Sequence, residues 1–447
     1  MQRVQVGLIG AGTVGGGVWN ALARNGPLMA SRLGIRLDVA AVAVRDPARS
    51  RAARIPGKLF RIDWRQVVLH PDVQVVVELM GGTTTARDAV VTALRAGKPV
   101  VTANKALVSA HGEELFTEAA RHGVNLYYEA SVAGGIPIIK MLRESLVGNR
   151  VTRIAGIVNG TCNYILTRMQ REGVAFADVL VDAQRLGYAE AEPSLDVDGH
   201  DAAHKTAILA SLAHGFWVNP ASVHTEGIQD LSPLDIEFAG RLGYTIKLLG
   251  IVKCLTQDRR PRSRRSGPPP SCAIQASVYP ALVPKTHVLA SVGDAFNAVA
   301  VRGDIVGDAL FYGRGAGAEA TASSVLSDLA DAVLDLKHGS HRRVPPFVAH
   351  EVHGRVIPLA EVVSRYYVRL AVVDRPGVFA RISGVLARAR VGISSIIQPE
   401  GHAGDTVPVI LMIHDAPNAT LQRVLRQIAA LPVVRTAPVM IRVEDLE

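Results

Sequence analysis

The sequence predicts an α/β protein in three parts: a doubly wound parallel sheet, an α+β domain and a small C-terminal module. Strand and helix patterns alternate from Val4 to about Arg121, change character near Val132, and form a βαββαβ series from about Tyr367. Alternation with continuously apolar strands is typical of parallel sheets covered by helices on both faces. The order βαββαβ is that of a ferredoxin-like fold.

The domain boundaries are expected where these patterns change. Residues 1–131 form the first part, to which the segment around 300–336 also contributes, and residues 132–337 form the second part. A basic, proline-containing linker at 338–364 precedes the third part at 365–447.

Each part has its own expected elements. In the first, the strands are Val4–Ile9, Leu37–Val44, Val73–Glu78 and Pro99–Thr102, and the helices are Val14 to about Arg24, Arg87–Ala96 and Glu113–Arg121. In the second, they are strands Val151–Val158, Thr245–Lys253, Cys272–Tyr279 and Ala298–Val301, helices Ile138–Leu146, Phe176–Leu186, Asp201–Ala213 and Ala320–Leu336, and a glycine-rich turn at Gly313–Gly317. In the third, they are strands Tyr367–Val373, Ile393–Gln398, Val407–His414 and Val434–Val443, with helices Val378–Arg390 and Ala419–Leu431.

The composition is that of a globular protein. Hydrophobic residues make up 48% of the chain and charged residues 20%, whereas disordered chains have fewer apolar residues and more charge. The chain has no run of about 18 apolar residues, so we expect no membrane span, and its immediate first strand leaves no room for a signal peptide. The three cysteines, Cys162, Cys254 and Cys272, form no disulfide or zinc pattern, which favours a reducing cytoplasm.

The net charge of +9 would suit a nucleic-acid ligand, but it depends on one short tract. Five arginines lie between Arg259 and Arg265, and without them the charge is 9 − 5 = +4. The tract continues into Gly267-Pro268-Pro269-Pro270, so we interpret it as an exposed insertion. We therefore expect no nucleic-acid partner; an RNA- or DNA-associated protein is the alternative.

A glycine-rich turn directly follows the first strand and opens the first helix. Gly10 allows the tight turn, Gly12 lets the backbone approach a pyrophosphate, and Gly15 lets helix and strand pack closely. The free N–H groups and the dipole at the helix start favour phosphates. The sequence therefore predicts a Rossmann-type site for a nicotinamide dinucleotide, with contacts from Gly10, Gly12, Thr13, Val14 and Gly15.

The residues after the second strand bear on the choice between NAD and NADP. An acidic residue there holds the ribose 2′-hydroxyl of NAD, but this chain has Val44-Arg45-Asp46. Because an arginine can form a bidentate contact with the 2′-phosphate, we expect NADP(H) to be preferred, or both NADP and NAD to be used. The alternative is that Arg45 is a solvated loop residue and that Asp46 binds the ribose.

Residues 187–205 contain five carboxylates and end in a lysine. Asp201 and Lys205 lie four residues apart, on one face of a helix. Carboxylates suit a substrate with an ammonium group, and a lysine of lowered pKa can exchange a proton. Lys105 comes just after Thr102, at the carboxyl end of a strand, where open parallel sheets bind ligands. The alternative is an acidic surface loop followed by an ordinary ion pair.

Residues 187–205 and Thr102-Ala103-Asn104-Lys105 resemble signatures of the homoserine dehydrogenase family, as do segments at 159–166, 297–307 and 312–317. The Arg375-Pro376-Gly377-Val378 turn resembles that of an ACT domain, which many bacterial members carry. The resemblance covers nearly the whole chain. It implies NAD(P)-dependent interconversion of L-homoserine and L-aspartate 4-semialdehyde, a step in threonine, methionine and isoleucine biosynthesis.

The resemblance also implies roles for single residues. Lys205 would be the general acid–base and Lys105 would assist at the same oxygen. Glu190 and Asp201 would bind the substrate, with Asp196 a weaker candidate. We also expect cofactor contacts from Lys105, Gly187 and Gly303.

A structural sodium ion and partners are implied in the same way. Glu129 would bind Na⁺ together with the carbonyl groups of Val132, Gly134 and Ile136, a ligand set that suits a hard cation. The chain would form a homodimer or homotetramer, with threonine or another amino acid as effector at the ACT domain. Two alternatives are another amino-acid-linked NAD(P) dehydrogenase and a non-catalytic amino-acid sensor.

Overall fold

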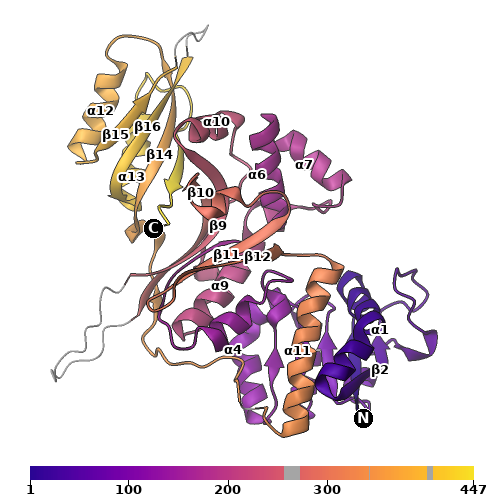
Figure 1. Ribbon diagram of the computed structural model, residues 1–447. Helices are drawn as coiled ribbons and strands as arrows, with labels where there is room; N and C mark the ends of the chain where they lie inside the picture. The colour runs from indigo at the N-terminus through magenta and orange to yellow at the C-terminus, as the bar shows by residue number, and fades with distance from the viewer. Residues whose placement is uncertain (256–271, 342, 400–405, 447) are drawn as a thin grey trace, which may run out of the picture.

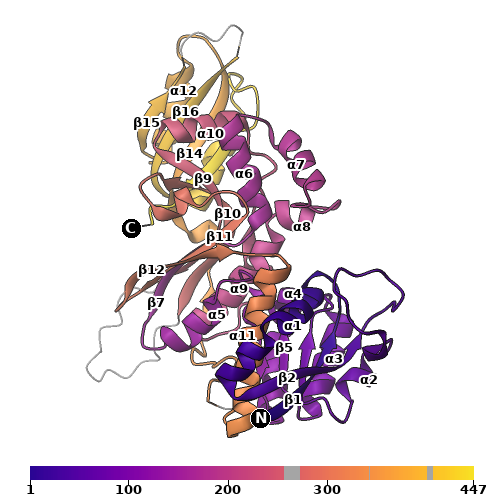
Figure 2. The same cartoon turned by 45° about the vertical axis from the view of Figure 1, so that its right-hand side comes forward.

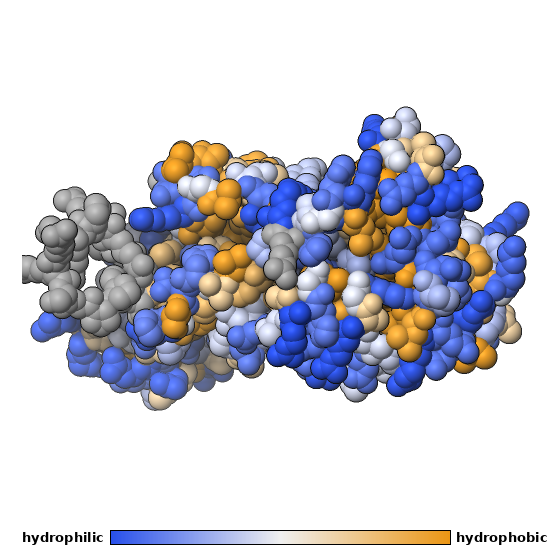
Figure 3. Space-filling model, turned by 90° about the horizontal axis from the view of Figure 1, so that it is seen from below, coloured by the Kyte–Doolittle hydropathy of each residue, from blue (hydrophilic) through white to orange (hydrophobic). Residues whose placement is uncertain are grey.

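The computed structural model describes residues 1–255, 272–341, 343–399 and 406–446. The elements form two sheets, one of six strands and one of eleven, and the arginine tract at 259–265 lies outside the described residues. In the described parts of the chain, no helix is long and apolar enough to cross a membrane. The face drawn in Figure 3 is largely hydrophilic, and its hydrophobic side chains form separate groups.

The first sheet is parallel throughout, and its strands have the order β3-β2-β1-β4-β5-β6. They are β1 (Gln2–Ile9), β2 (Ile35–Ala43), β3 (Phe60–Arg61), β4 (Val75–Glu78), β5 (Val100–Thr102) and β6 (Leu126–Tyr127). The helices between them are α1 (Thr13–Leu33), η1 (Gly57–Leu59), α2 (Arg65–Val68), α3 (Thr84–Arg95) and α4 (Lys105–Arg121). The chain order reverses between β1 and β4, at the point where such sheets bind ligands. The predicted doubly wound sheet is confirmed.

Two helices of this part are longer than predicted. Helix α1 continues beyond Arg24 to Leu33 and packs against a helix from far along the chain, α11 (Ala318–His338). Figure 1 shows α11 beside α1. Helix α4 begins at Lys105 rather than Glu113, since the side chain of Asn104 caps it by accepting from the Leu107 N–H at 3.1 Å.

The second sheet is mixed and begins with the order β12-β11-β7-β9-β10. These strands are β7 (Val151–Ile157), β9 (Tyr244–Cys254), β10 (Ala273–Pro284), β11 (Phe296–Gly303) and β12 (Gly307–Arg314), and two short strands, β8 (His224–Thr225) and β13 (Arg355–Val356), pair with β10. Its helices are η2 (Glu129–Ser131), α5 (Ile138–Lys140), η3 (Met141–Ser145), α6 (Gly160–Glu172), α7 (Phe176–Arg185), α8 (Ser194–Val197), α9 (His200–His214), η4 (Pro220–Ser222), α10 (Pro233–Arg241) and η5 (Val288–Ser291).

Strand β12 was not predicted. Its glycines at 307 and 313 resemble turn residues, and it lies at the edge of the sheet, where only one neighbour, β11, constrains the pattern. The expected glycine-rich turn is therefore shorter than predicted, because Gly313 and Arg314 belong to the strand.

The C-terminal module has the predicted order βαββαβ after a short turn, η6 (Leu359–Glu361). Its elements are β14 (Val363–Val373), α12 (Val378–Arg388), β15 (Ile393–Ile397), β16 (Thr406–Pro417), α13 (Asn418–Ala429) and β17 (Val439–Val443). Strand β17 pairs with β14 on one side and, in parallel, with β10 on the other. The module and the second domain thus share one continuous sheet, as Figure 2 shows.

Candidate active site

Two lysines from different domains meet at one buried carboxylate. Asp201 lies in the first turn of α9 and is 3% exposed. Its Oδ1 is 2.8 Å from the Nζ of Lys105, the first residue of α4, and its Oδ2 is 2.7 Å from the Nζ of Lys205, one turn further along α9. The structure therefore brings together Lys105, Asp201 and Lys205, which the sequence singled out.

The three groups shift one another's protonation. Burial lowers the pKa of Lys205 below its ordinary value, and the charge of Lys105 adds to this effect. Burial also acts to lower the pKa of Lys105, but the surrounding carboxylates, chiefly Asp201, outweigh it, so that this pKa is raised. Burial acts to raise the pKa of Asp201, but the two lysine charges hold it far below its usual range. Of the two lysines, Lys205 is thus the one that releases a proton more readily.

Asn159 is a site residue that sequence reasoning did not assign. Its Oδ1 caps α6 by accepting from the Cys162 N–H at 2.8 Å, and its Nδ2 donates to Asp201 at 2.9 Å and to Asp196 at 2.8 Å. Burial raises the pKa of Asp196, which Asn159 partly offsets. Asn159 had a signal, since it opens the motif at 159–166 in a position that favours an N-cap.

Glu190 lies on the exposed loop that leads to α8, and its side chain is open to solvent. The loop is fixed through its backbone: Gln184 donates to the Glu190 carbonyl at 3.0 Å, and Thr161 donates to the Tyr188 carbonyl at 2.8 Å. The charge of Glu190 makes a small contribution to the raised pKa of Lys105. Gly187, also exposed, takes a left-handed conformation with φ 78° at the start of the loop.

The glycine turn has the geometry that its motif predicts. Gly10 has φ 102°, and a Cβ there would lie 2.6 Å from the Leu79 carbonyl oxygen. A Cβ on Gly15 would overlap the Gly10 carbonyl, whereas one on Gly12 would meet nothing within 4 Å. No side chain caps α1, which begins at Thr13, so the first N–H groups face the open side of Gly12. This space suits a pyrophosphate.

Arg45 lies two residues beyond β2 and is exposed. The carboxylate of Asp46 accepts from the Ala48 N–H at 2.9 Å, so it is engaged in a local turn. The Asp46 carbonyl accepts from Arg51, whose guanidinium stacks over Phe60 at 5.0 Å. Both Arg45 and Asp46 are exposed, but of these two side chains only the carboxylate of Asp46 has a hydrogen bond within the described loop.

A second residue without a sequence assignment is Glu78, which ends β4 and is fully buried. Its carboxylate accepts from the Met80 N–H at 2.8 Å and from the Thr102 hydroxyl at 2.6 Å, and that hydroxyl accepts from the Asn104 N–H at 3.0 Å. Glu78 therefore ties the loop after β4 to the segment that ends at Lys105. A charged residue at the end of an apolar strand was a signal, but the sequence does not show that its partner is Thr102.

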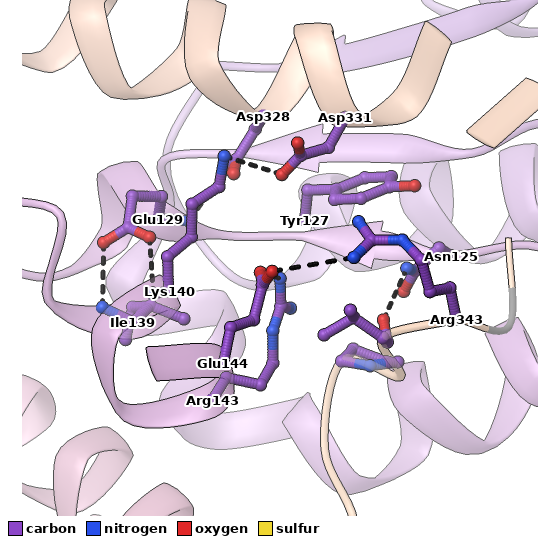
Figure 4. Close-up of polar contacts among 12 residues, drawn as sticks. Asn125, Tyr127, Glu129, Ile139, Lys140, Arg143, Glu144, Asp328, Asp331 and Arg343 are labelled. Atoms are coloured by element: carbon purple, nitrogen blue, oxygen red, sulfur yellow. Dashed lines mark hydrogen bonds and ion pairs between the residues drawn. The ribbon is translucent and has the colours of Figure 1, made fainter. Parts of the chain in front are cut away.

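The residues expected to bind sodium lie at the junction of the two domains. Glu129 is buried, and its two carboxylate oxygens accept from the backbone N–H groups of Ile139 at 2.8 Å and Lys140 at 2.7 Å (Figure 4). The Gly134 carbonyl accepts from Ser324 at 2.6 Å, and the Ile136 carbonyl accepts from the Ile138 N–H at 2.8 Å. In this geometry Glu129 caps the start of α5. Across the described ranges, no three His, Cys, Asp or Glu residues cluster as a metal site.

Gly303 is placed apart from the glycine turn. It ends β11, where a Cβ would lie 2.8 Å from the Asn149 side chain, and its strand partners are Val151 and Gly307. The late segment that does reach the first domain is helix α11, because it packs against α1 and a Cβ on Gly17 would lie 2.5 Å from the Ala318 carbonyl oxygen.

Comparison with known proteins agrees with this geometry. The family model described as "Homoserine dehydrogenase, NAD binding domain" matches residues 10–129, and the model "Homoserine dehydrogenase" matches residues 137–330. A homoserine dehydrogenase of Pseudomonas aeruginosa is 42% identical over 454 residues, which cover 100% of each chain.

Solved structures give the same result. A homoserine dehydrogenase from Thiobacillus denitrificans has a TM-score of 0.91 at 41% identity, over 100% of this chain and 99% of that one. A hyperthermophilic archaeal homoserine dehydrogenase in complex with NADPH has a TM-score of 0.62 at 25% identity, over 75% of this chain and 98% of that one. The chain therefore belongs to the homoserine dehydrogenase family.

Proposed function

We propose that this NAD(P)-dependent oxidoreductase interconverts L-homoserine and L-aspartate 4-semialdehyde, with Lys205 as the general acid–base. The observation that carries the proposal is the buried carboxylate of Asp201 held between Lys105 and Lys205 at 2.8 and 2.7 Å. The nicotinamide supplies the chemistry of hydride transfer with C4 of the substrate. In the direction of oxidation, neutral Lys205 accepts the hydroxyl proton; in reduction, its ammonium form donates a proton to the carbonyl oxygen.

The other charged residues of the site have separate proposed roles in binding. The raised pKa of Lys105 keeps it protonated, so it stabilises negative charge on the same oxygen. Each carboxylate oxygen of Asp201 already contacts one lysine, so Asp201 orients the two lysine side chains at the substrate site. The exposed carboxylate of Glu190 remains for the substrate ammonium group, with Asp196 a secondary candidate.

We propose that NADP(H) is preferred, or used together with NAD. The exposed guanidinium of Arg45 beside an Asp46 that is engaged locally supports this choice. The cofactor contacts proposed are Gly10, Gly12, Thr13, Val14, Gly15, Arg45 and Lys105; Gly187 and Gly303 stay predictions, and the position of Gly303 does not favour its role.

A structural Na⁺ at Glu129 is a further proposal. Ala133 and Gly134 take left-handed conformations with φ 54° and 51°, a strained turn that can point several carbonyl groups to one side. The oxygens of Glu129, Gly134 and Ile136 accept one hydrogen bond each in the contacts described above and keep lone pairs for a cation. Together with Val132 they would hold the ion, which would stabilise the domain junction.

The remaining proposals concern organisation. Exposed Leu310 and Tyr312 on the edge strand β12 support pairing with a second copy in a dimer or tetramer. The βαββαβ order supports an ACT domain at 365–447 that binds threonine or another amino acid, after a linker at 338–364, a cofactor domain at 1–131 and a catalytic domain at 132–337. The small number of cysteines, three in the whole chain and without a disulfide or zinc pattern, supports a cytoplasmic location.

The decisive experiment is steady-state kinetics of the purified protein with L-homoserine and each of NADP and NAD. Turnover with homoserine and a larger kcat/KM with NADP are expected. Absence of turnover above a blank without homoserine would refute the proposed substrate.

A further inference from the structure

A partly buried ion pair joins the C-terminal module to the second domain, since 34% of the Glu226 side chain is exposed. Arg442 of β17 is 1% exposed, and its Nη1 and Nη2 donate to the two carboxylate oxygens of Glu226 at 2.8 and 2.9 Å. Its Nη2 also donates to Asn418 at 3.0 Å, and the guanidinium lies 4.6 Å from the centre of the Tyr279 ring. The pKa of Glu226 falls to about 2: burial opposes this change, but hydrogen bonds from His224 and Arg442 outweigh it. Glu226 is thus fixed in place from the module side.

Glu226 in turn lies against the segment 197–199. A Cβ on Gly199 would lie 3.1 Å from the Glu226 carbonyl oxygen. A Cβ on Gly227 would overlap the Val197 carbonyl and lie 2.8 Å from the Cα of Asp198. The Ile228 N–H donates to the Val197 carbonyl at 2.9 Å. The two backbones are in direct contact, so a displacement of Glu226 must be passed on to residues 197–199.

The segment 197–199 lies between two carboxylates of the candidate active site. It connects α8, which holds Asp196, to α9, where Asp201 is the second residue. Gly199 caps α9 with φ 86°, a left-handed conformation that fixes the direction in which the helix starts. Arg442 is therefore connected to Asp201 in three steps. It pairs with Glu226, the backbone at Glu226 contacts residues 197–199, and Gly199 begins the helix that carries Asp201.

We propose that Glu226 and Arg442 are positioning residues for the substrate site, which set the placement of Asp201 through residues 197–199. The inference rests on the proposed role of Asp201 beside Lys105 and Lys205. It gives the C-terminal module a direct mechanical link to the substrate site but not to the glycine turn, which lies in the other sheet.

The same two parts of the chain share a second, partly buried ion pair, which provides a matched control. Arg369 of β14 donates from Nε to Asp235 Oδ1 at 2.6 Å and from Nη2 to Asp235 Oδ2 at 3.0 Å. Asp235 is fully buried and belongs to the capping box of α10 with Ser232. Its hydrogen bonds are with Ser232, Tyr367 and Arg369 rather than with the segment 197–199.

The test compares Glu226→Gln and Arg442→Met with Asp235→Asn and Arg369→Met in the full-length protein. All four should lower Tm. Only the first two should raise KM for homoserine, by about tenfold, while KM for NADP stays within about twofold. Equal changes of the homoserine KM in both pairs, or none in the first pair, would overturn the proposal. Arg442→Lys, which keeps the charge, should lie between wild type and Arg442→Met.

Amide hydrogen exchange separates this inference from the proposed function, because it needs no substrate. In Glu226→Gln, peptides covering residues 196–203 should exchange faster than in wild type, and in Asp235→Asn they should not. Unchanged exchange of these peptides in Glu226→Gln would refute the positioning role, whereas failure of wild type to turn over homoserine would refute only the function. If Arg442→Met does not fold, Glu226→Gln and Arg442→Lys give both measurements.

Discussion

The cofactor site and the substrate site are built in different ways. The phosphate-binding part of the proposed cofactor site is one continuous stretch of backbone, Gly10 to Gly15, where N–H groups and open space at Gly12 suit a phosphate. The substrate site is assembled from side chains of three helices: Lys105 of α4, Asn159 at the start of α6, and Asp201 with Lys205 on α9. The first should therefore respond to changes in backbone geometry, and the second to changes in charge.

The largest expected effect tests the substrate site. Lys205→Ala should lower kcat by about 10²- to 10⁴-fold, the usual contribution of a general acid–base. Binding of NADPH, measured by fluorescence titration, should stay near that of wild type, because Lys205 belongs to the other site. Lys285→Ala, which removes an exposed lysine, is the control. Near-normal turnover of Lys205→Ala would exclude the assignment.

The next prediction compares two glycines of the same turn. Gly10→Ala should lower the free energy of unfolding by about 3 kcal/mol, because the new Cβ would meet the Leu79 carbonyl at 2.6 Å in a left-handed backbone. Gly12→Ala should leave Tm unchanged, since nothing lies within 4 Å, and should raise the Kd of NADPH by about tenfold. Thermal unfolding and cofactor titration measure both. A Gly12→Ala protein that binds NADPH normally would contradict the phosphate site.

A third prediction concerns charge coupling between the lysines. Homoserine oxidation needs neutral Lys205, so kcat/KM should rise with pH through an apparent pKa below 10.5. Reduction needs the ammonium form and should fall with rising pH over the same range. Because the charge of Lys105 helps to lower the pKa of Lys205, Lys105→Met should move the midpoint to higher pH. An unchanged midpoint would show that the two lysines are not coupled.

A smaller effect is expected at the rim of the cofactor site. Arg45→Ala should raise KM for NADP by about tenfold and leave KM for NAD nearly unchanged, because only NADP has a 2′-phosphate. Arg51→Ala is the matched control, since its guanidinium is engaged with the Asp46 carbonyl and Phe60. If Arg45→Ala raised KM for NADP and for NAD equally, Arg45 would have no role in the preference for NADP over NAD.

The smallest effect is the change in Tm expected from sodium at its proposed site beside Glu129, at the junction of the two domains. NaCl should raise Tm by about 2–4 °C relative to choline chloride at equal ionic strength, as expected for a ligand that binds only the folded state. Glu129→Gln should remove the difference. A wild-type Tm that is the same in both salts would leave Glu129 as a helix cap alone.

The contrast between the two sites also explains what could be predicted from the sequence. The glycine turn was predictable because its function depends on neighbouring backbone groups, and Lys105, Asp201 and Lys205 stood in motifs with their own spacing. Glu78 and Arg442 could not be found in that way. Glu78 pairs with Thr102, which is 24 residues away, and Arg442 pairs with Glu226, which is 216 residues away. Both lie in strands, where the sequence pattern predicts burial but does not identify a partner. Long-range contacts of this kind depend on the tertiary fold.

Strand β17 lies between β14 and β10, with which it pairs in parallel at Ala281 and Leu282. Removing the C-terminal module would therefore leave the N–H and C=O groups of β10 at Ala281 and Leu282 without their strand partner, and an exposed strand edge promotes aggregation. The proposed amino-acid binding to the module should therefore be tested by point substitutions in it rather than by a stop codon. A truncated chain that precipitates would say nothing about regulation.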